Sequence, residues 1–125
     1  DIERMETVPQ GMRDYYKAWT QAVIADGRYV PGYYAHSHNA QQIFDDVTPI
    51  FQAAGVKEAP RFWIASGRNF NKGKAPTEVG HEFAAIWQGV LDITEVWGGI
   101  RLPIDINVSD TPNPSAPASE AATED

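Results

Sequence analysis

The chain has 125 residues, 42% of them hydrophobic and 11% aromatic, which is enough for one globular unit with a buried core. Its net charge of −7 argues against nucleic acids and anionic membrane surfaces as partners, because both attract basic patches, and it favours a neutral or small-molecule partner. The absence of Cys excludes a disulfide framework and a thiolate zinc site. No apolar run approaches the roughly 18 residues that a membrane span needs.

The chain opens on Asp1-Ile2-Glu3 without an initiator Met or a preceding strand. We interpret this start as a cut through a longer protein, close to its active site. Two carboxylates at positions i and i+2 of an extended segment point to the same face, with Cα atoms about 6.5–7 Å apart. That arrangement suits paired acid/base chemistry on a sugar. The alternative is that both are frayed terminal carboxylates without a catalytic role.

A helix and a strand are expected next. Residues 8–26 carry apolar side chains with the 3.6-residue period of an amphipathic helix, and Gly27 follows as a stop signal. The aromatic segment 30–36 then predicts a short strand that ends near His36.

The same pattern repeats once. Residues 40–54 predict a second helix with Asn39 as its cap, in which Pro49 should introduce a kink or a break. Residues 61–66 form a nearly continuous apolar run, which is typical of a parallel strand buried on both faces. Helices that alternate with strands at this spacing indicate an α/β fold.

The last third of the chain has a different texture. Residues 67–82 are rich in Gly and basic residues and predict a long loop, and residues 83–88 predict a third strand. Residues 92–99 are interpreted as a turn-rich connection to a fourth strand at 104–108. The segment 109–125 has no aromatic residue and no apolar period, so it should be a disordered tail or a linker.

Each expected strand is apolar in the middle and polar at its carboxyl end. In parallel α/β folds the carboxyl ends of the strands share one mouth, where function gathers. The polar residues expected there are Asp1 and Glu3, His36 and His38, Ser66 and Arg68, Gln88, and Asp105 and Asn107. Five strands cannot close an eight-stranded barrel alone, so an open sheet with the same polarity is the alternative.

Five short segments, in order and at suitable spacing, resemble one known family. They are Asp1-Ile2-Glu3 and the segments 30–34, 62–65, 86–88 and 98–107. Together they resemble the second half of the glycoside hydrolase family 25 (lysozyme-like) barrels, and in texture their relatives, the glycoside-hydrolase-like domains of actinobacterial secreted proteins. The similarity covers residues 1–108.

The resemblance implies a TIM-type (β/α)8 barrel, of which residues 1–108 would hold the end of strand 4 through strand 8. The missing N-terminal half of the barrel would be its structural partner. It also implies an extracellular or cell-envelope location and a polysaccharide ligand, with no membrane insertion and no cofactor.

The family's acidic pair at the end of strand 4 corresponds to Asp1 and Glu3. Glu3 would be the general acid, Asp1 would assist it, and Asp105 would shape the sugar-binding mouth. The implied activity is hydrolysis of N-acetylated cell-wall polysaccharide, and the alternative is a catalytically silent barrel that binds the same glycan. Three aromatic residues match inward-facing positions that can stack on sugar rings: Tyr34, Trp63 and Trp87.

Several interpretations remain open at this stage. Trp63 and Trp87 suit a barrel core as well as a sugar platform, whereas Trp97 is interpreted as a packing residue. We interpret His36 and His38 as loop or capping residues rather than metal ligands, because no carboxylate set accompanies them. An unrelated open α/β module is the third reading of the whole chain.

Overall fold

The computed structural model describes residues 7–65 and 83–109. Asp1 and Glu3, the loop expected at 67–82 and nearly all of the tail expected at 109–125 lie outside these ranges. The described elements, in chain order, are α1 (Gln10–Asp26), β1 (Gly32–His36), α2 (Ser37–Ala53), β2 (Arg61–Ala65), β3 (Ala84–Trp97) and β4 (Ile100–Ser109).

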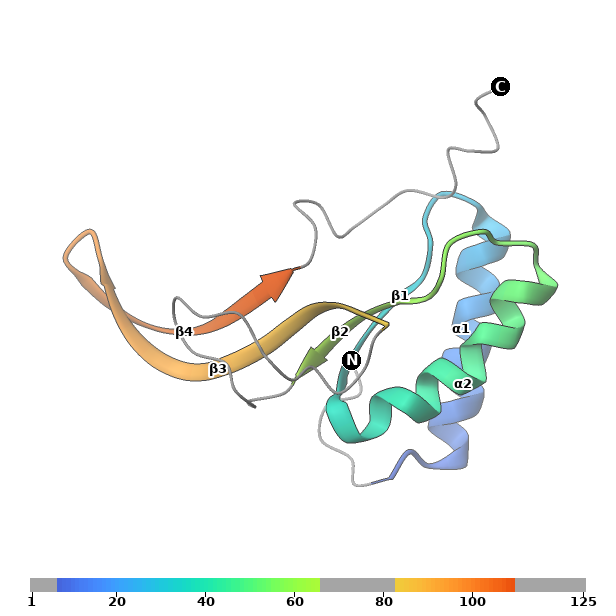
Figure 1. Ribbon diagram of the computed structural model, residues 1–125, viewed down its shortest axis with the longest axis horizontal. Coiled ribbons are helices and arrows are strands. Elements are labelled where there is room, and N and C mark those ends of the chain that lie inside the picture. The colour runs from blue at the N-terminus through green and yellow to red at the C-terminus, as the bar shows by residue number, and fades with distance from the viewer. Residues whose placement is uncertain (1–6, 66–82, 110–125) are drawn as a thin grey trace.

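The described strands form one four-stranded sheet in the order β1-β2-β3-β4 (Figure 1). β1 pairs parallel with β2, and β2 pairs parallel with β3, as expected from their apolar sequences. α2 connects β1 to β2, as the crossover of a parallel pair requires.

The expected half of a (β/α)8 barrel is wrong. β4 runs antiparallel to β3 and follows it through the two-residue turn Gly98-Gly99, not through a crossover helix. Both glycines have a positive φ, 58° and 79°, as the tight turn of a β-hairpin demands. The described part of the sheet is therefore open and mixed, which corresponds to the alternative of an open sheet.

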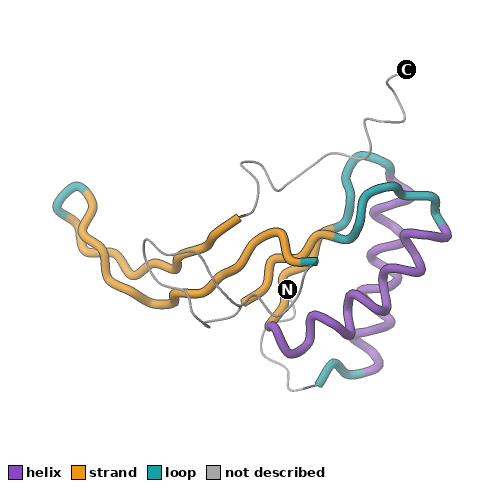
Figure 2. Tube along the Cα trace, viewed as in Figure 1, coloured by secondary structure: helices purple, strands orange, loops and turns teal. Residues whose placement is uncertain are grey.

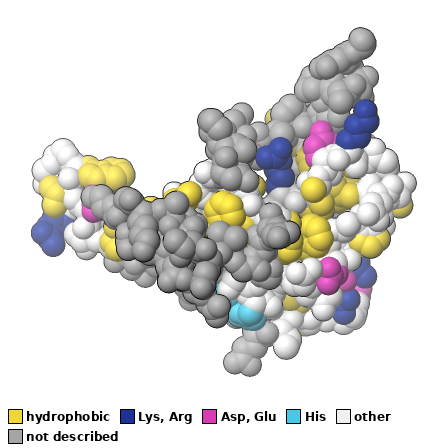
Figure 3. Space-filling model, viewed as in Figure 1, with side chains coloured by type: hydrophobic (Ala, Val, Ile, Leu, Met, Phe, Trp, Pro, Cys, Tyr) yellow, Lys and Arg dark blue, Asp and Glu magenta, His cyan; other side chains and the backbone are white. Residues whose placement is uncertain are grey.

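The turn-rich connection expected at 92–99 is also wrong, because β3 continues through it to Trp97. The polar residues of this segment alternate with apolar ones in the period of a strand. The resulting hairpin extends away from the helices (Figures 1 and 2). Its far end exposes apolar side chains (Figure 3), among them Trp97, which is 57% exposed and not a packing residue.

α2 differs from its expectation at two points. It begins at Ser37, with His36 rather than Asn39 as its N-cap, and the His36 ring accepts a hydrogen bond from the His38 backbone N–H. The helix also continues through Pro49 to Ala53 without a break. Proline costs a helix one backbone hydrogen bond. Here the residues around Pro49 bury an apolar face against the sheet, which offsets that loss.

Both helices cover the same face of the sheet, and the core lies between them and β1 to β3 (Figure 2). The buried apolar residues that form it are Tyr16, Tyr33, Ala35, Ala40, Ile43, Val47, Phe51, Phe62, Ile64 and Ala84. Burial raises the pKa of Tyr33 to about 12, and its hydroxyl hydrogen-bonds Thr20 at 2.7 Å. This packing fixes the orientation of the strands, and thereby of the side chains on their other face.

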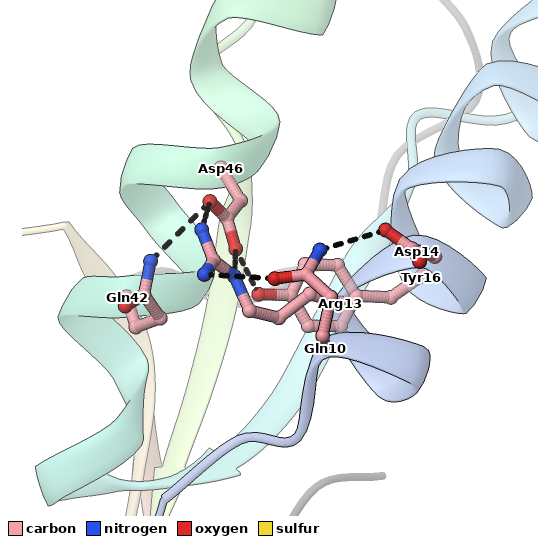
Figure 4. A network of polar contacts seen from close by, with 6 residues as sticks. All are labelled: Gln10, Arg13, Asp14, Tyr16, Gln42 and Asp46. Atoms are coloured by element: carbon pink, nitrogen blue, oxygen red, sulfur yellow. Dashed lines mark hydrogen bonds and ion pairs between the residues drawn. The ribbon is translucent and has the colours of Figure 1, made fainter.

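The two helices are also joined by a polar clamp (Figure 4). Asp46 on α2 accepts hydrogen bonds from Arg13 Nε at 2.9 Å and Arg13 Nη2 at 2.8 Å, and from the Tyr16 hydroxyl. The Asp46 side chain is only 7% exposed. Burial opposes its ionisation, but the hydrogen bonds from Arg13 and Tyr16 outweigh that effect and hold the pKa of Asp46 below its usual range.

Candidate functional site

The face of the sheet opposite the helices carries most of the residues selected from the sequence. Successive side chains of a strand point to opposite faces. Because Tyr33, Phe62 and Ala84 face the helices, Tyr34, Trp63 and Gln88 point to the other side. Asn107 pairs with Gln88 across the β3–β4 ladder and joins them. We call this side the helix-distal face, defined by Tyr34, Trp63, Gln88, Asp105 and Asn107.

A chain of hydrogen bonds crosses this face. The Tyr34 hydroxyl on β1 donates to Gln88 Oε1 on β3, and Gln88 Nε2 donates to Asp105 Oδ2 on β4 at 3.0 Å. Gln88 is 7% exposed, so its carboxamide is held at both ends in a nearly buried position. Asp105 is exposed and receives a fixed orientation from a partner that cannot rotate without losing two bonds.

An aromatic pair lies beside this chain. The rings of Tyr34 and Trp63 meet edge to face with centroids 4.9 Å apart. Trp63 Nε1 donates to Asn107 Oδ1 at 2.8 Å, which directs the Asn107 amide nitrogen to another side. That nitrogen has no partner within the described ranges, so its two N–H groups can donate to a ligand.

A pocket of about 370 Å³ adjoins the aromatic pair at the amino-terminal end of β1 and β2. The residues of its wall that matter for the argument are Tyr29, Gly32, Tyr34, Arg61, Trp63 and Ile86. Tyr29 is 63% and Trp63 38% exposed, so both present ring surface to a ligand. The helix-distal face thus combines an aromatic hollow with a row of oriented polar groups.

The remaining predicted site residues have different surroundings. His36 follows Tyr34 on β1, with its ring against His38 and the two Nδ1 atoms 2.7 Å apart. Its capping role agrees with the sequence interpretation. Trp87 lies on the helix side, packed against the core, and its buried Nε1 has no hydrogen-bond partner in the described part of the chain. The structure does not bring Trp87 to the helix-distal face.

Sequence reasoning missed Tyr29, Gly32 and Arg61, which line the pocket. They stand at the amino-terminal ends of β1 and β2, whereas our search followed the carboxyl ends. The signal that could have found them is the glycine itself. Gly32 occupies a strand position without a positive φ, so the backbone does not require glycine there.

Two general findings bear on the site. Among the described residues, no group of three or more His, Asp or Glu side chains is placed to hold a metal ion. No helix in the same ranges is long and apolar enough to cross a membrane.

Comparisons with protein-family models, with curated proteins and with solved structures return no match for this chain. The resemblance to family 25 glycoside hydrolases therefore stays a prediction, as do the catalytic roles of Glu3 and Asp1.

Proposed function

We propose that this chain binds a carbohydrate on the helix-distal face, with an N-acetylated cell-wall glycan as the class of ligand. The observation that carries the proposal is the Tyr34–Trp63 ring pair, which lies directly beside the bound chain of Gln88 and Asp105. A pyranose has one apolar face and a rim of hydroxyl groups. It needs an aromatic surface and oriented polar groups at the same place.

The polar groups of this face suit the second half of that requirement. Asp105 offers carboxylate oxygen as an acceptor, and Asn107 offers amide N–H groups as donors. Gln88 and Trp63 hold these two side chains in place through bonds of 3.0 Å and 2.8 Å. Groups that are oriented before binding lose little conformational entropy when a ligand arrives.

Trp63→Ala tests this proposal. Covering about 55 Å² of its ring at about 25 cal/mol/Å² contributes about 1.4 kcal/mol, so we expect the Kd to rise about 10-fold. Isothermal titration calorimetry with chitohexaose, a neutral oligomer of N-acetylglucosamine, measures the change. Trp63→Phe keeps an aromatic face and should stay within a few-fold of the wild type.

The matched control is Trp97→Ala at the tip of the hairpin, which removes an exposed tryptophan of the same kind away from the site. It should leave the Kd unchanged. Equal losses in the two alanine variants would show that sugar does not bind at Trp63, and no binding to chitohexaose or to soluble peptidoglycan fragments would refute the proposal.

Hydrolysis is a separate question from binding. We propose it only as an extension, because it depends on Glu3 and Asp1, which the resemblance assigns to acid/base catalysis. Release of reducing ends from the bound glycan, lost in Glu3→Gln while the Kd is kept, would support the extension. Binding without any release would leave a glycan-binding protein.

A further inference from the structure

We propose that the pocket above Gly32 is a subsite for a sugar unit that carries a carboxylate, and that Arg61 recognises this group. The inference rests on the proposed function, because the pocket adjoins the Tyr34–Trp63 pair. It goes further by naming the class of glycan: an acidic chain, in which uronic-acid-like units alternate with the units bound at the polar groups.

The pocket exists because a side chain is absent. Gly32 pairs with Arg61 in the β1–β2 register, one row away from the pair of Tyr34 and Trp63. Alternate residues share a face, so Gly32 and Arg61 also belong to the helix-distal face. A Cβ added at Gly32 would meet nothing closer than the Arg61 carbonyl oxygen at 3.6 Å, an ordinary contact. Glycine here leaves space that a larger side chain would fill.

The walls of this space suit a ring. Tyr29 and Trp63 are among the most exposed large apolar side chains of the described chain, at 63% and 38%, and both line the pocket. The volume of about 370 Å³ exceeds that of one pyranose unit, so a substituted sugar can enter. A flat, largely apolar hollow by itself would take a neutral ring.

The charge of the pocket narrows the choice. Arg61 is the only charged residue that lines it, in a chain whose net charge is −7. An anionic ligand is repelled by such a chain as a whole, and a local guanidinium offsets that repulsion at short range. The planar fork of Arg binds a carboxylate with two parallel N–H···O bonds, a geometry that Lys cannot reproduce.

The experiment compares one ligand in two charge states. Hyaluronan hexasaccharide, which alternates glucuronate with N-acetylglucosamine, and the same molecule with its carboxylates converted to methyl esters are titrated into the wild-type protein. We expect the acid to bind about 10-fold tighter than the ester at low salt. The preference should shrink as salt screens the pair.

Two variants locate the effect. Arg61→Gln should bring the acid and the ester to equal affinity, whereas Arg61→Lys should retain part of the preference. Gly32→Val fills the hollow with a good strand former and should weaken binding of the acid about 10-fold. Gly11→Val is the matched control, because a Cβ at Gly11 meets nothing within 4 Å.

The outcomes separate the two proposals. Equal binding of acid and ester by the wild type, with chitohexaose still bound, overturns the acidic subsite and leaves the proposed function intact. A preference for the acid that survives in both Arg61→Gln and Gly32→Val places the carboxylate elsewhere and also overturns it. Failure of the wild type to bind any of the three oligosaccharides refutes the proposed function together with the subsite.

Discussion

Phe62→Ala should destabilise the protein by about 3–5 kcal/mol, the usual cost of removing a buried aromatic ring. Phe62 is 1% exposed and lies at the centre of the core between the helices and the sheet. Its ring centroid is 5.1 Å from that of Tyr33, 4.9 Å from Phe83 and 6.0 Å from Phe44. Truncation leaves a cavity among three rings that cannot all move inward.

Urea denaturation measures this loss, and the neighbouring residue supplies the control. Trp63 follows Phe62 in β2 but points to the helix-distal face and is 38% exposed. Trp63→Ala removes a ring of larger size, yet it should cost only about 1–2 kcal/mol, since less apolar surface and one hydrogen bond are lost. Equal costs for the two variants would show that the helix-distal face is as tightly packed as the core.

The parts of the fold that the sequence predicted are those governed by local pattern. The helix expected at 8–26 and the strands expected at 30–36 and 61–66 agree with α1, β1 and β2 within a few residues. Parallel pairing followed from strands that are apolar on both faces. The hairpin did not follow, because Gly98-Gly99 was interpreted as part of a loop although paired glycines between alternating segments also indicate a tight turn.

The barrel prediction failed for a different reason. It came from a family resemblance that joins short segments in order, and such a match carries no information on strand direction. Antiparallel pairing of β4 depends on the length of the connection after Trp97, which is two residues. A crossover between parallel strands needs about a dozen residues or more, so the connection alone decides the direction.

The candidate site was predicted in part. The polar carboxyl ends of the strands brought Gln88, Asp105 and Asn107 together on the page, and their hydrogen bonds join them and their aromatic neighbours in space. The sequence could not separate Trp63 from Trp87. Both sit inside apolar strands, and a register irregularity after Phe62 in the β2–β3 ladder sets which face each one meets. Such shifts have no signal in a single sequence.

Asp46→Asn should destabilise the protein by about 2 kcal/mol at neutral pH, because it removes the charge that holds Arg13 and leaves buried donors with a poorer acceptor. The Asp46 carboxylate receives both nitrogens of the Arg13 fork and the hydroxyl of Tyr16, which is 4% exposed. Asp26→Asn is the matched control. Asp26 also pairs with an arginine, Arg28, at 2.7 Å, but the pair is exposed to solvent and should contribute little.

The pH dependence of the same variant tests the charge directly. The pKa of Asp46 is lowered in the folded protein, by hydrogen bonds that outweigh its burial, relative to about 3.9 for an unfolded Asp. The stabilisation is therefore complete above about pH 5 and is lost as the pH falls below about 4 and through the folded-state pKa. Urea denaturation at a series of pH values should show the wild type approaching Asp46→Asn as the pH falls. A difference between the two proteins that stays constant from neutral to acid pH would show that the clamp does not depend on an ionised Asp46.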